Sequence, residues 1–220
     1  MVSISVLLPT LNEGQNIEKV IREVRSVLPG SEIVVIDGLS TDRTVEIAKS
    51  LGARIILEKQ KGKGVAIKRA FNEVDSDLIL MIDADLTYPV KEMPHFIELL
   101  KEYDVIMGSR FKGRFEEGSM PFINGIGNRI ICLWASALFL KPVSDICTGM
   151  WGFRKKAYKS IVISAQTFEL ECNMFAQSVK KGLKIVEVPI TYSRRGGESK
   201  VRLIDGAKDC VLLLKERFKP

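Results

Sequence analysis

Short apolar runs that alternate with segments of helical period restrict the fold of this chain more than any other feature. Four runs rich in β-branched residues fall at 3–8, 32–36, 53–57 and 78–82. The segments between them repeat apolar residues every three or four positions, as helices that cover a core do. Strands that alternate with helices in this way are typical of a parallel sheet with crossover connections. We therefore predict an α/β fold with a mostly parallel, Rossmann-like sheet flanked by helices.

The second half of the chain follows a less regular pattern. We expect a strand at 104–107, a mobile loop rich in glycine and charge at 108–121, and one or two amphipathic helices at 122–140. Beyond residue 140 the pattern predicts helices at 158–163 and 169–181, a strand at 184–192, a basic loop at 193–202 and a last helix at 203–218.

Composition excludes several kinds of site. The 220 residues include one histidine, His95, so a histidine-rich zinc site or a Ser-His-Asp triad is hard to build. The four cysteines lie far apart without a Cys-x-x-Cys pair, which favours a reducing, cytoplasmic setting. The longest apolar stretch, 130–140, is shorter than the roughly 20 residues that span a bilayer. We expect this stretch to lie on a membrane and not to cross it.

Charge divides the chain into two unlike halves. Residues 1–120 carry 16 basic and 19 acidic side chains, whereas residues 121–220 carry 17 and 8, a net charge of +9. A basic surface suits an anionic partner, either the phosphates of a lipid surface or those of a nucleic acid. If the protein were a nucleic-acid-binding module, however, Asp83 and Asp85 would have no role.

Asp83-Ala84-Asp85 directly follows the apolar run 78–82. Two carboxylates at positions i and i+2 after a strand converge on one hard cation, such as Mg²⁺ or Mn²⁺, that also takes diphosphate oxygens. The alternative is a solvated acidic turn. The strand context favours the metal site, because ligands of such sheets bind at the carboxyl ends of the strands.

Two further motifs point to a nucleotide. Asp37 ends the second run and suits a hydrogen bond to a ribose or a base, although an Asx turn explains it equally well. The segment Lys61-Gly-Lys63-Gly64 precedes a helix, where backbone amides and Lys63 meet phosphate. It is not a phosphate-binding loop of ATPases, and no dinucleotide-binding glycine motif follows a strand.

Taken in order, the motifs resemble the family 2 inverting glycosyltransferases, in particular the dolichyl-phosphate mannose synthases and polyprenyl-phosphate glycosyltransferases. The matching positions are Pro9 to Glu13, Val35 to Asp37, Ser40 to Thr44, Gly62 to Ala66, Asp83 to Leu86, Gly108 to Arg110, Asp145, Thr148-Gly149, Glu187 to Ile190 and Gly197 to Lys200. The resemblance implies a GT-A fold, a nucleotide-sugar donor and a divalent metal, Mg²⁺ or Mn²⁺.

The resemblance also implies roles for individual residues. Asp83 and Asp85 would hold the metal, and the catalytic set would be Asp85, Arg110, Arg129 and Asp145. The nucleotide would be bound by Pro9, Leu11, Glu13, Asp37, Lys63, Asp83 and Ala84. The acceptor phosphate would be bound by Arg110, Arg129, Ser199, Lys200 and Arg202. Asp145 would either orient the acceptor or pair with an arginine. Many relatives have an Asp and a Gly where this chain has Gly38 and Leu39.

The chemistry of transfer favours a phosphate acceptor, which is already anionic and needs no base to attack. We thus expect transfer of a hexose to a polyprenyl (dolichyl) phosphate, from GDP-mannose first and UDP-glucose second. A sugar-phosphate nucleotidyltransferase is the rival enzyme. Residues 1–118 would bind the nucleotide sugar and the metal, and residues 119–220 would form a basic acceptor part near the membrane. We expect a cytoplasmic protein, peripheral on the cytoplasmic face of a membrane, with no nucleic-acid partner.

Overall fold

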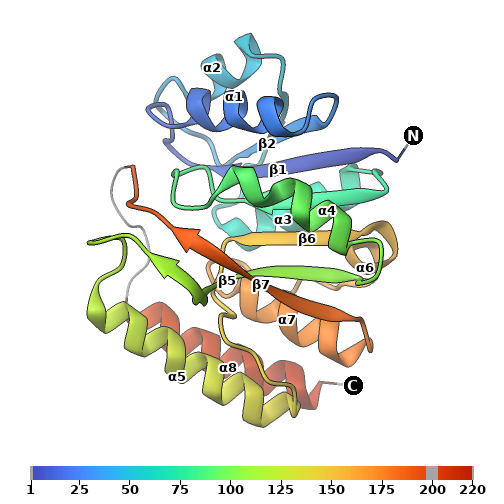
Figure 1. Cartoon of the computed structure of the whole chain (residues 1–220), viewed down its shortest axis with the longest axis vertical. Coiled ribbons are helices and arrows are strands. Elements are labelled where there is room, and N and C mark those ends of the chain that lie inside the picture. Colours follow the sequence, from blue (N-terminus) through green and yellow to red (C-terminus); the bar gives the residue numbers. More distant parts are fainter. Residues whose placement is uncertain (1, 197–202, 220) are drawn as a thin grey trace.

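The computed structural model describes residues 2–196 and 203–219 and shows one sheet with helices on both faces (Figure 1). Within these residues the sheet has seven strands in the order β3-β2-β1-β4-β6-β5-β7. Strand β6 is antiparallel to both of its neighbours, and the other pairs are parallel. The predicted mostly parallel α/β sheet is confirmed. The strands are β1 Ile4–Thr10, β2 Glu32–Asp37, β3 Arg54–Leu57, β4 Leu78–Ile82, β5 Val105–Phe115, β6 Met150–Arg154 and β7 Ile185–Tyr192.

The helices form one layer on each face of the sheet. Successive residues of a strand point to opposite faces, so Leu7 packs in one core cluster while Val6 and Leu8 pack in the other. One layer is made by α1 Ile17–Val27, α2 Thr44–Ser50, the 3₁₀ turn η1 Val90–Glu92 and α4 Met93–Leu99. The other layer is made by α3 Lys63–Glu73, α5 Phe122–Phe139, α6 Lys155–Ser160, α7 Leu170–Lys180 and α8 Leu203–Phe218.

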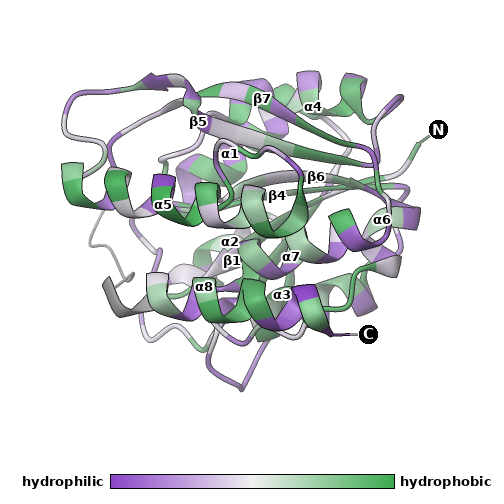
Figure 2. Ribbon diagram, turned by 90° about the horizontal axis from the view of Figure 1, so that it is seen from below, coloured by the Kyte–Doolittle hydropathy of each residue, from purple (hydrophilic) through white to green (hydrophobic). Residues whose placement is uncertain are grey.

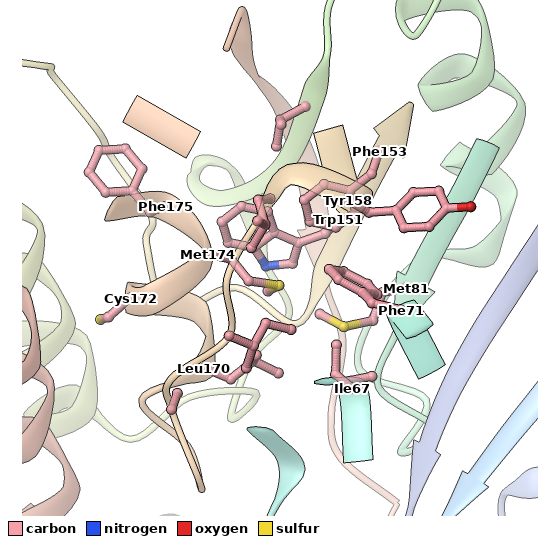
Figure 3. Packing of buried hydrophobic residues seen from close by; sticks show 14 of the residues in the cluster. Ile67, Phe71, Met81, Trp151, Phe153, Tyr158, Leu170, Cys172, Met174 and Phe175 are labelled. Atoms are coloured by element: carbon pink, nitrogen blue, oxygen red, sulfur yellow. The ribbon is translucent and has the colours of Figure 1, made fainter. Parts of the chain in front are cut away.

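The core under the second layer contains a group of packed aromatic side chains (Figure 3). Trp151 and Phe153 of β6 stack with ring centroids 5.7 Å apart, and Phe71 of α3 meets Phe153 edge-on at 5.5 Å. These contacts hold α3 against the middle of the sheet. Since α3 begins at Lys63, they also fix the position of the segment 61–64, which was predicted to contact phosphate.

In the second half of the chain two expectations were wrong and one strand was missed. The predicted mobile loop 108–121 is strand up to Phe115, because β5 continues to pair with β7 beyond an irregularity after Ser109. Gly113 belongs to this pairing, since a Cβ there would overlap the backbone of Ile190. Strand β6 was not predicted, and α6 ends at Ser160 where a helix from 158 to 163 was expected.

The amphipathic segment forms one continuous helix, α5, which lies beside α8 (Figure 2). By length and composition alone, its 18 residues are long and apolar enough to cross a membrane, and 17% of this span is buried. The apolar run 130–140 on which the expectation rests is the second part of this helix, which begins eight residues earlier, at Phe122.

Candidate active site

The carboxyl ends of β1, β2 and β4 lie next to one another at the C-terminal end of the parallel strands. These three strands are adjacent and parallel, and Thr10 pairs with Asp37 at the ends of the first two. Strand β4 ends at Ile82, immediately before Asp83. The sequence predicted this gathering, since parallel strands carry their carboxyl ends to the same side of a sheet.

The loops after β1 and β2 are bound to each other. Ser40 accepts a hydrogen bond from the Asn12 N–H at 2.7 Å, and the Asn12 side chain accepts one from the Thr41 N–H at 2.8 Å. Asn12, Leu39 and Leu86, which lie in the three strand-end turns, have φ values of 54°, 65° and 67°. Residues other than glycine rarely adopt this left-handed backbone conformation, and backbone strain of this kind concentrates at functional sites.

Asp83 is paired with a buried lysine. The Lys63 ammonium lies 2.6 Å from Asp83 Oδ1 and 2.6 Å from Glu171 Oε1, so it bridges the end of β4 and the start of α7. Burial opposes the lysine charge, but the two carboxylates outweigh it and raise the pKa of Lys63 above its ordinary value. Lys63 is therefore cationic at neutral pH and is held directly against Asp83, one of the two predicted metal ligands.

Asp85 is paired with a second cation. Its Oδ2 lies 2.6 Å from Arg195 Nη2, and its Oδ1 accepts hydrogen bonds from the backbone and hydroxyl of Thr87. The Gly196 N–H donates to the Asp85 carbonyl at 2.9 Å. Burial, followed by the charge of Asp83, raises the pKa of the Asp85 carboxyl. The charge of Arg195 acts in the opposite direction and favours the ionised form of this carboxylate.

Gly149 and Tyr88 close the site on the β6 side. The Gly149 N–H donates to the Tyr88 hydroxyl at 2.6 Å, and a Cβ at position 149 would overlap the Asp83 carboxylate. The Tyr88 ring meets Tyr192 edge-on at 5.2 Å. The loop that leads into β6 therefore approaches Asp83 as closely as a backbone can, which is why glycine is needed there.

Asp37 is fully buried and its carboxylate is engaged within the protein. It accepts hydrogen bonds from the Ser40 N–H at 2.8 Å and from the Thr10 hydroxyl at 3.1 Å. This is the Asx turn that the sequence left open as the alternative to a nucleotide contact.

The other residues expected to bind the nucleotide lie at the same strand ends. Pro9 belongs to β1, Leu11 follows it and is 43% exposed, and Ala84 is buried between the two aspartates. Glu13 accepts a hydrogen bond from the Asn16 side chain at 2.9 Å, and its own N–H donates to Thr44.

Arg110 and Asp145 form a buried bidentate pair. Arg110 Nε and Nη2 lie 2.7 Å from Oδ2 and Oδ1 of Asp145, and the Arg110 N–H donates to the same carboxylate. The guanidinium also donates to the Cys147 carbonyl and lies 5.1 Å from the centroid of the Tyr192 ring. Of the two roles that the sequence left open for Asp145, the structure displays the arginine pair.

The remaining predicted acceptor residues lie farther along the chain. Arg129 is an exposed residue of α5 whose guanidinium lies 5.1 Å from the centre of the Phe111 ring. Ser199, Lys200 and Arg202 lie outside the described residues.

Sequence reasoning did not assign Glu171, Tyr88 or Arg195 to the site. Glu171 is 108 positions from Lys63, so no local pattern links the two residues. Arg195 was expected only as part of the basic loop 193–202. Tyr88 could have been assigned to the site from the sequence, because it stands three positions after Asp85 in the segment that follows β4.

The donor set fits a hard divalent ion. Asp83 and Asp85 supply carboxylate oxygens, the ligand type that Mg²⁺ and Mn²⁺ take. Each of these carboxylates already lies against a cationic nitrogen at 2.6 Å, so the site is built to hold positive charge between β4 and its neighbours.

The order of the strands and the helix layers are those of the GT-A fold, which solved glycosyltransferases similar to this chain share. Residues 5–162 match glycosyl transferase family 2, and the chain belongs to this family. The family resemblance, the fold and the enzyme class predicted from the motifs are thereby confirmed.

Named relatives and solved structures agree with this assignment. A dolichyl-phosphate hexose transferase of Haloferax volcanii is 36% identical over 200 residues, which cover 90% of this chain and 86% of the relative. A dolichol-phosphate mannosyltransferase of Pyrococcus furiosus is 31% identical over 210 residues, or 90% of this chain and 59% of the relative. The UDP complex of glucosyl-3-phosphoglycerate synthase from Mycobacterium tuberculosis shares the fold, with a TM-score of 0.80, 23% identity and coverage of 100% and 81%.

Proposed function

We propose that the protein transfers a hexose, with inversion, from a nucleotide sugar to a polyprenyl phosphate in the presence of Mg²⁺ or Mn²⁺. The names of the relatives that act on dolichyl and undecaprenyl phosphates support the acceptor. GDP-mannose is the first choice of donor, because two of these relatives are named mannosyltransferases. UDP-glucose is the second, and it is the donor bound with Mn²⁺ in a structural neighbour.

The single observation that carries the proposal is the pair Asp83 and Asp85, each held by a cation at the carboxyl end of β4. When bound there, the ion supplies charge neutralisation for the diphosphate leaving group. Lys63 adds a fixed positive charge beside Asp83, and the tight approach of Gly149 holds that carboxylate in one orientation. Preorganised charge of this kind lowers the barrier without a general acid.

The acceptor side needs positioning and not a base. A phosphate monoester carries its nucleophilic oxygen as an anion, so a fixed cation that orients it is sufficient. Arg129 is exposed and rests on Phe111, which leaves its guanidinium free of any carboxylate in the described part of the chain. Arg110 is held by Asp145 and stiffens the wall between β5 and the loop before β6. Residues 119–220 would form this acceptor part, and residues 1–118 the donor part.

The face made by α5 and α8 would lie against the membrane. The two helices and the residue after α5 carry these exposed apolar side chains: Phe122, Ile123, Ile126, Ile130, Leu133 and Leu140 with Val211, Leu214 and Phe218. Arg129, Lys141, Lys215 and Arg217 lie on or beside the same helices. Apolar side chains edged by basic ones suit the interface of an anionic membrane, where the apolar groups enter the acyl boundary. We infer a peripheral position on the cytoplasmic face.

The proposal is tested first on the donor. Thermal shift with GDP-mannose and with UDP-glucose, each with and without Mn²⁺ or Mg²⁺, should give one donor a metal-dependent rise in melting temperature. The same donor with a short polyprenyl phosphate should then give the β-linked product from an α-linked sugar nucleotide.

A matched pair of variants makes the test specific. Asp85→Asn should abolish the metal-dependent shift and the transfer, whereas Asp75→Asn, at an exposed aspartate paired with Lys155, should leave both intact. Release of pyrophosphate from a nucleoside triphosphate and a sugar phosphate would instead favour a nucleotidyltransferase. Full transfer by Asp85→Asn would overturn the metal assignment.

A further inference from the structure

The fold brings together cysteines that are far apart in the sequence. Cys132 of α5, Cys147 of the loop before β6, Cys172 of α7 and Cys210 of α8 all pack in the same core cluster. All four are free thiols. Figure 3 shows the Cys172 sulfur pointing away from the Trp151 indole, on the far side of α7. Helix α8 packs against α7 and contributes Asp209 as well as Cys210.

Three potential ligands meet at one point in this cluster. The sulfurs of Cys147 and Cys172 and one carboxylate oxygen of Asp209 all lie within 4.8 Å of one another. Cys172 is 1% exposed and Asp209 is 7% exposed. In a tetrahedral zinc site with bonds of about 2.3 Å to sulfur and 2.0–2.2 Å to oxygen, neighbouring ligands are about 3.3–3.8 Å apart. Small rotations of the three side chains are enough to bring the ligand atoms from within 4.8 Å to this spacing.

We propose that Cys147, Cys172 and Asp209 bind one thiophilic divalent ion of the Zn²⁺ type. Two thiolates select such an ion over Mg²⁺ and Mn²⁺, which prefer the all-oxygen pair Asp83 and Asp85. The chain would then hold two ions of different chemistry at two separate places. This inference does not rest on the proposed glycosyl transfer.

The position of the cluster gives the ion a structural role. Cys147 accepts a hydrogen bond from Arg110 through its carbonyl, and Cys172 follows Glu171, the partner of Lys63. The ion would therefore tie α8 both to the loop that carries the Arg110–Asp145 pair and to the helix that positions Lys63. Ligands from three elements distant in sequence stabilise a fold because the unfolded chain does not preform the site.

The test uses the full chain, kept reduced, stripped of metal and then titrated with Co²⁺ in excess Mg²⁺, which occupies the all-oxygen site. We expect one equivalent of Co²⁺ to bind with a thiolate-to-cobalt charge-transfer band and to be displaced by Zn²⁺. Cys147→Ser and Cys172→Ser should each remove the band and weaken binding more than about tenfold. Cys132→Ser is the control, since its hydroxyl can replace the sulfur that accepts the Ile146 N–H.

Two results would overturn the proposal. One is wild-type protein that binds Co²⁺ without the charge-transfer band, and the other is a band that persists in both serine variants. Thiol titration of the metal-free chain before each experiment checks that no Cys147–Cys172 disulfide has formed. A chain that loses two thiols and takes up no metal would show that the two cysteines form a disulfide and not a metal site. If a serine variant does not fold, Asp209→Asn supplies the second ligand test.

Discussion

Arg195 and Asp85 form an ion pair, with the guanidinium Nη2 2.6 Å from the carboxylate Oδ2. Asp83 has a corresponding pair with Lys63 at the same distance. The two carboxylates proposed to hold a metal are thus neutralised by cations from β7's following loop and from α3. A divalent ion that binds Asp85 has to share or displace the charge of Arg195.

Arg195→Gln should therefore tighten metal binding. Removing a partly exposed competing charge contributes about 1 kcal/mol, which corresponds to roughly a fivefold lower Mn²⁺ concentration at half-maximal donor binding. Titration of Mn²⁺ by thermal shift at a fixed donor concentration measures this. Arg194→Gln is the control, because Arg194 donates to the Glu117 carbonyl and not to Asp85. Weaker Mn²⁺ binding by Arg195→Gln would show that this arginine supports the ion and does not compete with it.

Two glycine-to-alanine variants should act in opposite directions. Gly149→Ala places a methyl group against the Asp83 carboxylate and about 2.9 Å from the Tyr88 ring, so both stability and metal-dependent donor binding should fall. Gly127→Ala meets nothing within 4 Å in helix α5 and should raise the free energy of unfolding by about 0.5–1 kcal/mol. Urea denaturation of both variants checks this. An unchanged donor site in Gly149→Ala would contradict the close approach that the structure describes.

The part of the site proposed to bind the donor could be predicted from the sequence, because the local pattern of a strand followed by polar residues determines it. The run 78–82 is a buried strand, and Asp83 to Asp85 must follow it wherever the strand lies in the sheet. Parallel pairing then brings the ends of β1, β2 and β4 together without further information.

The partners of those residues could not be predicted, because they come from elements with large sequence separation. The position of Glu171 beside Lys63 depends on the packing of α7, and that of Arg195 depends on β7 reaching the far edge of the sheet. Strand β6 was missed because its residues Met150 to Arg154 are few and lack the β-branched type. The glycines of β5 read as a loop signal, although Gly113 permits the close pairing with Ile190.

An acidic residue on the face of α5 should weaken membrane binding. Leu133 is 72% exposed, and transfer of such a side chain into an apolar environment is worth about 1.5–3 kcal/mol. Leu133→Asp should therefore reduce binding to anionic lipid vesicles by at least about tenfold, measured by co-sedimentation. Val162→Asp, which alters an exposed apolar residue outside α5 and α8, should bind as the wild type does. Equal loss in both variants would argue against this face as the membrane surface.

Asp42 should stabilise the donor loops in a pH-dependent way. Its carboxylate accepts hydrogen bonds from the Gly14 N–H at 2.8 Å and the Thr44 N–H at 3.0 Å. Burial alone would raise the pKa of Asp42, but these hydrogen bonds and that of the Thr44 hydroxyl lower it.

A group with a lowered pKa in the folded state contributes stability at neutral pH, and this contribution is lost as the pH falls through the folded pKa. Asp42→Ala should cost about 1 kcal/mol at pH 7, as the loss of a helix cap does. The difference from wild type should begin to shrink near the usual pKa of 3.8 and be smallest below the lowered pKa of the folded state, measured by urea denaturation at pH 7 and at a series of pH values below 4. A difference that grows in acid would contradict the assignment.

Arg129→Ala should affect the acceptor far more than the donor. The exposed guanidinium rests on Phe111, and a hydrogen bond from it to a phosphate oxygen is worth about 1.5–3 kcal/mol. The KM for a short polyprenyl phosphate should rise about 10- to 100-fold, while the thermal shift with donor and Mn²⁺ stays at the wild-type value. Arg22→Ala is the control, since Arg22 is an exposed residue of α1 paired with Glu18. Equal changes in donor and acceptor binding would remove Arg129 from the acceptor site and leave its contact with Phe111 as a structural one.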